Sequence, residues 1–251
     1  NFAYGEFLTL GAFASVWIAA AGLSLPLAAA IAVPLVGLAG VLLARVFYDP
    51  LMSRGLLPLL VTSVGLAFVV QNLIHMVAGA NPIRYPIPLV RPFVVEGFFV
   101  PREQAFIILT ALATMLGVHL LLRLTLIGKK MRAVADNPTL ARASGISSAR
   151  VLAVTWFLSA AIGALGGILL AVTQITFQAD MGFRFLLVVF AAVLLGGIGS
   201  PYGAMLGGLL VGIGMELGTT YVSADYTYAF AFVLLILVLI LPPRGIMGGV
   251  N

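Results

Sequence analysis

Long apolar runs separated by short polar segments dominate the pattern along the chain. A helix needs roughly 20 predominantly apolar residues to cross the hydrocarbon core of a bilayer. We therefore expect an all-α fold, a polytopic bundle of transmembrane helices. The pattern predicts eight hydrophobic segments, at residues 6–21, 26–44, 55–78, 105–122, 151–173, 185–198, 204–218 and 227–241.

One predicted segment is short, because residues 185–198 would reach only about 21 Å at roughly 1.5 Å per residue. An alternative prediction folds 185–198 and 204–218 into a re-entrant hairpin, which leaves six full spans. Both alternatives place the two termini on the same side of the membrane. The sequence starts at Asn1 and enters an apolar run within a few residues, so we also expect a truncated N-terminus, preceded by further residues such as another helix.

Composition agrees with a chain whose solvent is lipid. Hydrophobic residues make up 62% of the 251 residues and charged residues 8%, whereas soluble domains carry about 25% charged residues. So few charges do not cover a surface that faces water, which excludes a soluble domain. We expect residues 1–251 to form a single transmembrane domain in contact with membrane lipid.

Basic residues are distributed unequally between the two sides that the spans define. They collect in cytoplasmic loops of membrane proteins, so we expect segment 123–150 and the C-terminus in the cytoplasm, and loop 79–103 outside. The same rule explains the net charge of +5 without a nucleic-acid partner. The predicted cytoplasmic side holds Arg45, Arg54, Arg123, Lys129, Lys130, Arg132, Arg142, Arg150 and Arg244, and the other side holds Arg84, Arg91, Arg102 and Arg184.

Two connecting segments are long enough to hold structure of their own. The external loop 79–103 carries five prolines, whose spacing prevents regular helix and favours extended or turn conformations. It is either a plain connector or a docking surface and outer lid. In the cytoplasmic segment 123–150, Asn137 as N-cap, Pro138 at the first helical position and Gly145 at the end predict a short helix at 138–144. Its apolar side lies on its own helix ends, on lipid headgroups or on a partner protein.

Glycines recur at a spacing of four residues, as at Gly163–Gly167 and Gly203–Gly207. Such pairs let helix backbones approach closely in lipid. The run Gly199-Ser200-Pro201 predicts a break or tight turn.

Motifs for catalysis and metal binding are absent from the sequence. It contains no G-x-x-x-x-G-K-[ST] phosphate loop, no H-E-x-x-H helix and no G-x-S-x-G turn. The two histidines, His75 and His119, are predicted near opposite membrane faces, so a shared metal site is not expected. We therefore expect no catalytic residue, no metal site and no cofactor in this chain.

Polar groups inside the predicted spans are candidates for a substrate path, because burying them in lipid is costly. Glu6 lies at the start of the first span, where the alternative is a carboxylate that the helix dipole favours. Glu216 lies about two turns inside the outer boundary, where the alternative is snorkelling to the interface. Segment 55–78 carries further polar residues, which either hydrogen-bond neighbouring helices or line the path: Thr62, Ser63, Gln71, Asn72 and His75.

Three blocks of sequence resemble a known permease family. They are NFAYGEF at 1–7 with Leu10-Gly11-Ala12, GKKMRAVADNP at 128–138, and GGIGSPYGA at 196–204. Together they resemble a transmembrane permease subunit of the branched-chain (hydrophobic) amino acid ABC importers, in particular the shorter of that family's two paired permeases. The family commonly has His at the position of Tyr4, so any role of that position does not carry over.

The resemblance implies an importer in a bacterial or archaeal inner membrane, driven by ATP hydrolysis in separate subunits. Its partners would be a second permease, two ATPase subunits that bind ATP and Mg²⁺, and an external substrate-binding protein. It implies ATPase coupling through the cytoplasmic segment, where we predict Arg132, Asp136, Asn137, Pro138, Arg142 and Gly145. The predicted substrate path contains Glu6, Thr62, Gln71, Asn72 and Glu216, and the substrates are branched-chain or related small amino acids, with urea or short amides as the alternative.

Two other classes of protein compete with this interpretation. A proton-coupled secondary transporter or channel would use Glu216, but it predicts broken helices at matching positions of two halves, which the sequence does not show. An intramembrane enzyme needs a clustered acid and base, and Glu6 and Glu216 are predicted near opposite membrane faces.

Overall fold

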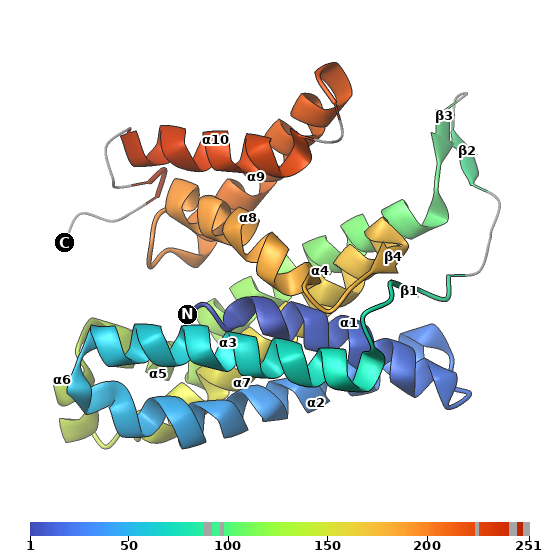
Figure 1. Ribbon diagram of the computed structural model, residues 1–251. Coiled ribbons are helices and arrows are strands. Elements are labelled where there is room, and N and C mark those ends of the chain that lie inside the picture. Colours follow the sequence, from blue (N-terminus) through green and yellow to red (C-terminus); the bar gives the residue numbers. More distant parts are fainter. Residues whose placement is uncertain (88–91, 96–97, 224–225, 241–244, 248–251) are drawn as a thin grey trace. The chain divides into compact units, whose positions relative to one another are not determined.

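The computed structural model describes residues 1–251 except 88–91, 96–97, 224–225, 241–244 and 248–251, and it is predominantly helical (Figure 1). Within the described residues, five helices are long and apolar enough to cross a membrane, accompanied by shorter apolar helices. The prediction of an all-α, polytopic transmembrane bundle is confirmed, and each predicted segment corresponds to a helix. The long helices are Leu25–Arg54, Leu56–Ala78, Arg102–Leu124, Ser148–Gln174 and Pro201–Tyr221, and the shorter ones include Tyr4–Ala20 and Met181–Gly196.

The chain divides into two compact units, Asn1–Gly182 and Phe183–Asn251. The first contains α1 (Tyr4–Ala20), α2 (Leu25–Leu43), a π-helical turn η1 (Ala44–Tyr48), a 3₁₀ turn η2 (Asp49–Arg54), α3 (Leu56–Ala78), β1 (Ile83–Arg84), β2 (Phe93–Val95), β3 (Phe98–Val100), α4 (Arg102–Leu124), α5 (Leu126–Asp136), α6 (Pro138–Ala143), α7 (Ser148–Gln174) and β4 (Thr176–Phe177). Helix α8 (Met181–Gly196) begins at the end of this unit, and the second unit continues with α9 (Pro201–Tyr221) and α10 (Thr227–Ile240).

Helix α7 packs against both α1 and α2 in the first unit. Glycines mark the closest contacts. A Cβ atom added at Gly11 would overlap the backbone of Ala164, and one added at Gly167 would overlap the backbone of Leu8. Without a strong hydrophobic force between helices in lipid, such close contact of backbones is a main source of helix association. The predicted packing role of the Gly163–Gly167 pair is therefore confirmed at Gly167.

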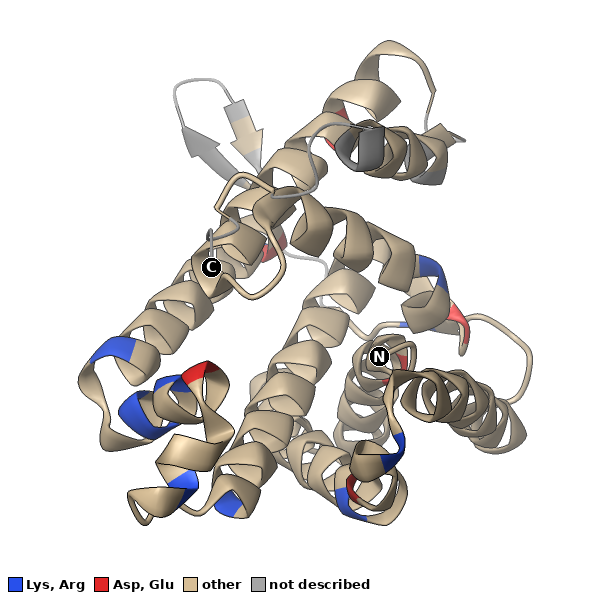
Figure 2. Cartoon of the chain, turned by 90° about the vertical axis from the view of Figure 1, so that its left-hand side faces the viewer, with Lys and Arg blue, Asp and Glu red and all other residues tan. Residues whose placement is uncertain are grey.

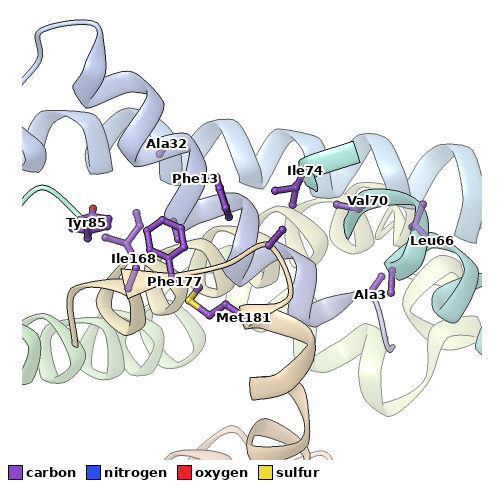
Figure 3. Close-up of a cluster of buried hydrophobic side chains, with 14 of the residues drawn as sticks. Ala3, Phe13, Ala32, Leu66, Val70, Ile74, Tyr85, Ile168, Phe177 and Met181 are labelled. Carbon is purple, nitrogen blue, oxygen red and sulfur yellow. The ribbon is translucent and has the colours of Figure 1, made fainter. Parts of the chain in front are cut away.

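A cluster of buried apolar side chains joins α1, α3 and the segment that follows α7 (Figure 3). The rings of Phe13 and Phe177 meet edge to face, with their centroids 4.9 Å apart. Segment 176–182 is therefore held against α1. The cluster includes Phe13 from α1, Leu66, Val70 and Ile74 from α3, and Phe177 and Met181 from segment 176–182.

Two short antiparallel pairs of strands lie in the connections. Strand β1 pairs with β4, with Ile83 opposite Phe177 and Arg84 opposite Thr176. Strand β2 pairs with β3 inside the proline-rich loop. The extended conformation predicted for loop 79–103 is found in these strands, while residues 88–91 and 96–97 of that loop lie outside the described residues.

Helix α4 differs from the other long helices of the first unit. None of its residues Arg102–Leu124, all of which the structure describes, is buried. Its contacts within the unit are with α5 and α7. The exposed side of α4, which includes Phe106, Leu109 and Leu116, is therefore available to lipid or to another chain.

The second unit is built on a close α8–α9 hairpin. Cβ atoms added at Gly196 and Gly207 would overlap the backbones of Gly203 and Ala192. The turn predicted at 199–201 is confirmed, since Gly199 has a φ of 91° and the Ser200 hydroxyl caps α9 by accepting from the Gly203 N–H at 3.0 Å. Helix α9 has 21 residues and α8 has 16, so α9 is long enough to cross a membrane and α8 is the shorter partner.

Candidate functional site

The α5–α6 hairpin between α4 and α7 forms the first part of the candidate site. The Asn137 side chain caps α6, with its Oδ1 accepting from the N–H groups of Thr139 and Leu140 at 3.0 Å each. Gly145 ends the turn after α6 with a φ of 79°, in the left-handed region that favours glycine. The short helix predicted at 138–144 is confirmed as Pro138–Ala143.

Every side chain predicted for coupling faces outward from this hairpin. Arg132 donates to the carbonyl of Leu122, and Arg142 Nε donates to the carbonyl of Pro138 at 3.2 Å, so both guanidinium groups are anchored on their own segment. Ala141 is the residue of α6 that is buried. The exposed set is Arg132, Asp136, Asn137, Pro138, Arg142 and Gly145.

Leu140 is a feature of this surface that the sequence analysis missed. Its side chain is 64% exposed on α6, between the capping residue and the buried Ala141. The exposure of Leu140 had a signal in the sequence, because it is an apolar residue next to the small residue Ala141. A helix of six residues is too short to bury two faces, so one of the two side chains remains exposed.

Charged residues are placed in agreement with a multi-pass membrane chain. In Figure 2 the Lys and Arg residues lie at the ends of the long helices and in the segments between them. Several of them surround the α5–α6 hairpin, including Lys129, Lys130 and Arg132. Basic groups at this surface would face anionic groups of lipid or of a partner.

The polar residues predicted for the substrate path differ in exposure and in the side of the helix on which they lie. Thr62 and Gln71 are half-buried on α3, but they are nine residues apart, which is about two and a half helical turns and puts them on opposite sides of the helix. Asn72 is exposed, and its Nδ2 donates to the carbonyl of Phe68 at 2.7 Å on the same helix. Glu216 is exposed on α9 in the second unit.

Glu6 has the most unusual position of these residues. It is 1% exposed, and neither of its carboxylate oxygens has a hydrogen-bond partner among the described residues. On the next turn of α1, the Thr9 hydroxyl accepts from the N–H of Gly182 at 3.0 Å. This contact was not predicted, because nothing in the sequence brings residues so far apart together.

Two further contacts connect the start of α1 and loop 79–103 to the bundle. The Ser63 hydroxyl on α3 accepts from the N–H of Phe2 at 3.1 Å. Ser15 and Tyr85 share a buried hydrogen bond of 3.0 Å between their hydroxyl oxygens, and burial raises the pKa of Tyr85. Tyr85 directly follows β1, so loop 79–103 is fastened to α1.

An apolar cavity of about 800 Å³ lies in the first unit between α2, α4 and α7. Its walls include Val33, Ile168 and Phe106, and polar groups at its edge include Ser24 and Glu103. Among the described residues, no group of three or more His, Cys, Asp or Glu side chains is placed to hold a metal ion.

Comparison with known proteins identifies relatives over nearly the whole chain. Residues 1–239 match the family model described as branched-chain amino acid transport system / permease component. The chain is 32% identical to the high-affinity branched-chain amino acid transport system permease protein LivH of Escherichia coli (strain K12), over 99% of this chain and 85% of that protein. It is also 32% identical to the corresponding permease protein BraD of Pseudomonas aeruginosa, over the same shares of the two chains.

A more distant match covers part of the chain. The probable branched-chain amino acid transport permease protein LivH of Methanocaldococcus jannaschii is 34% identical over 45% of this chain and 35% of that protein. No solved structure matches the chain.

Proposed function

Because the chain belongs to the family of branched-chain amino acid transport system permease components, we propose that it carries branched-chain or related small amino acids into the cytoplasm. It is a transport subunit rather than a catalyst. In this proposal, ATP and Mg²⁺ bind two separate ATPase subunits, a second permease completes the pathway, and an external binding protein delivers the substrate. The membrane is the inner membrane of a bacterium or archaeon.

The exposed α5–α6 hairpin is the observation that supports ATP-driven transport. Asn137 and Gly145 fix the two ends of α6, and Ala141 attaches it to the bundle, so α6 is a rigid, outward-facing element. An ATPase that moves such an element transmits the movement to α4 and α7, which flank it. This is how a rigid helix at an interface switches a protein between two states.

The orientation follows from the same hairpin. Segment 123–150 and the C-terminus are cytoplasmic in the proposal, because ATPase subunits act there and basic residues collect there. The β1–β4 pair and Tyr85 then lie on the outer side. The fastening of this loop to Ser15 supports a docking surface for the binding protein rather than a plain connector.

The second permease has a natural place against α4. A 23-residue apolar helix without a buried residue gains further packing energy from a partner that covers its exposed side. The proposed substrate path uses Glu6, Thr62 and Gln71 of the first unit. Asn72 and Glu216 are exposed in this chain. In the proposal they become part of the path where the partner permease packs over them.

The test is transport by the complete complex in proteoliposomes. We expect this chain to purify with a second permease and ATPase subunits, and wild-type vesicles with binding protein and internal ATP to accumulate radiolabelled leucine. Gly145→Pro should assemble but lose ATP-driven uptake, since proline fixes φ near −65° and the native φ is 79°.

Gly55→Pro is the matched control. Gly55 also has a positive φ, of 94°, and no atom lies within 4 Å of a Cβ added there, as at Gly145. It lies in the turn before α3, outside the α5–α6 hairpin. Uptake by Gly145→Pro equal to that of Gly55→Pro would rule out coupling through α6, and leucine uptake that does not depend on ATP would refute the importer itself.

A further inference from the structure

Glu6 differs from the other polar side chains that are buried in the described part of the chain. Those side chains are Thr9, Ser15 and Ser63, and each of their hydroxyls has a hydrogen-bond partner. Neither carboxylate oxygen of Glu6 has a partner among the described residues. A buried carboxylate without a donor is strongly unfavourable, so Glu6 requires a donor that the described residues do not supply.

The surroundings of Glu6 are apolar on several sides. Ala3, Glu6 and Phe13 share one side of α1, because residues three and seven positions apart lie on the same helical face. Ala3 and Phe13 belong to the cluster in Figure 3, together with α3 and with Phe177 and Met181 of segment 176–182. Asp180, in the same segment, lies within electrostatic range of Glu6 and adds a second negative charge.

We infer that Glu6 binds the α-ammonium group of the transported amino acid. This inference rests on the proposed function. An ammonium group brings a positive charge and three N–H donors, which match the charge and the two unpartnered oxygens of the carboxylate. A bound metal ion would need several protein ligands, and the described residues contain no group of three metal-binding side chains.

The same site distinguishes an amino acid with an aliphatic side chain from other small solutes. Phe13, on the same face of α1 as Glu6, and Phe177 and Met181, in the segment that carries Asp180, are apolar side chains for the aliphatic part of the substrate. Urea and short amides carry no positive charge and leave the carboxylate without a counter-charge. A fatty acid of the same shape as leucine keeps the carboxylate of leucine but has no ammonium group, so it brings only a negative charge and is repelled by Glu6.

Segment 176–182 closes the site in this structure. The contacts that hold it are the Gly182–Thr9 hydrogen bond, the Phe13–Phe177 ring contact and the pairing of β4 with β1. Substrate reaches Glu6 when this segment moves away from α1. Strand β1 belongs to the outer loop, so an event on that loop acts directly on the segment that covers Glu6.

The experiment measures leucine uptake by the complete complex in proteoliposomes. It compares Glu6→Gln with Glu6→Asp. The control is Asp49→Asn, which removes an exposed carboxylate of η2. Gln keeps the size of the side chain and removes its charge. We expect Glu6→Gln to assemble and to retain ATPase activity, but to lose leucine uptake by roughly 10- to 100-fold, as for the loss of a hydrogen bond to a charged group. Asp should restore part of the uptake, and Asp49→Asn should match wild type.

Uptake by Glu6→Gln within a factor of about two of wild type would overturn the inference, because a merely structural, protonated Glu6 is well replaced by Gln. That outcome leaves the proposed function intact, since wild-type vesicles still take up leucine. Failure of the wild type to take up leucine with ATP would instead refute the proposed function.

A second measurement does not depend on the folding of a variant. The wild-type complex is treated during turnover with dicyclohexylcarbodiimide. A protonated carboxyl group adds across one C=N bond of this reagent to give an O-acylisourea, which rearranges to a stable N-acylurea. The Glu6 peptide is then quantified by mass spectrometry. We expect saturating leucine to prevent the adduct and 4-methylpentanoate, which lacks the ammonium group, to leave it unchanged. Equal effects of the two compounds, or no adduct at Glu6 at all, would contradict the inference.

Discussion

The crossing of α1 and α7 allows a quantitative test with two neighbouring glycines. A Cβ atom added at Gly167 would lie 2.5 Å from the Leu8 Cα and closer still to its carbonyl group. Carbon atoms in contact are normally about 3.5–4.0 Å apart. At Gly166, on the same helix, no atom lies within 4 Å of the added Cβ. Gly167→Ala therefore forces two backbones apart, while Gly166→Ala places a methyl group in open space.

The expected difference in stability comes from overpacking alone. Replacing glycine by alanine inside a helix stabilises it by about 0.5–1 kcal/mol, and this gain is common to both variants. Inserting a carbon into a closely packed core costs about 1–3 kcal/mol. The obstacle at Gly167 is backbone rather than a flexible side chain, so we expect the upper part of that range for the difference between the two variants.

The assay is reversible unfolding of the purified chain in mixed micelles, followed by tryptophan fluorescence. Trp156 lies on α7, and its ring centroid is 4.8 Å from that of Tyr48 at the end of η1, so its fluorescence reports on the packing of α7. Gly167→Ala should unfold at lower denaturant than wild type, and Gly166→Ala at the same concentration or a higher one. If both variants have equal free energies of unfolding, the α1–α7 backbone contact is not the source of stability that we describe.

Two further predictions concern other parts of the chain. In the second unit, Gly207→Ala should destabilise the α8–α9 hairpin by about 1–3 kcal/mol while Gly208→Ala does not, because only a Cβ at Gly207 meets the backbone of Ala192. Thermal unfolding of both variants checks this prediction, and equal unfolding midpoints would contradict it. Tyr85→Phe removes the hydrogen bond to Ser15 and should cost about 1 kcal/mol near pH 7. Because burial raises the pKa of Tyr85, the stability linked to its protonated form is present below about pH 10 and is lost as the pH rises through the folded-state pKa. Thermal midpoints between about pH 8 and 11 should therefore fall more steeply for wild type than for Tyr85→Phe, and parallel curves would count against this linkage.

Local signals in the sequence were sufficient to predict the helices and their ends. Each apolar segment is a helix because lipid offers no hydrogen-bond partner, so the backbone N–H and C=O groups bond to one another within the segment. The cap at Asn137 and the turn at Gly145 depend on residues within a few positions of one another, so their chemistry alone predicts the short helix α6.

Contacts between distant segments were not predictable in the same way. The Thr9–Gly182 and Ser15–Tyr85 hydrogen bonds and the β1–β4 pairing join residues that no spacing rule connects. Thr62 and Gln71 come from one segment of the sequence, but they are nine residues apart, so the rotation of α3 puts them on opposite sides of the helix. The predictions for the path and coupling residues stay predictions.

The pairing of β4 with β1 limits how far loop 79–103 moves while Gly182 stays bonded to α1. Phe177, which is opposite Ile83, and Gly182, which bonds to Thr9, are five residues apart. A fully extended chain covers at most about 3.3–3.6 Å per residue, so this tether is at most about 18 Å long. If loop 79–103 is displaced beyond the reach of the tether while its strands remain paired, the start of α8 must leave α1 as well. The tether does not stretch, so a large movement of the loop releases Gly182 from Thr9 in one step.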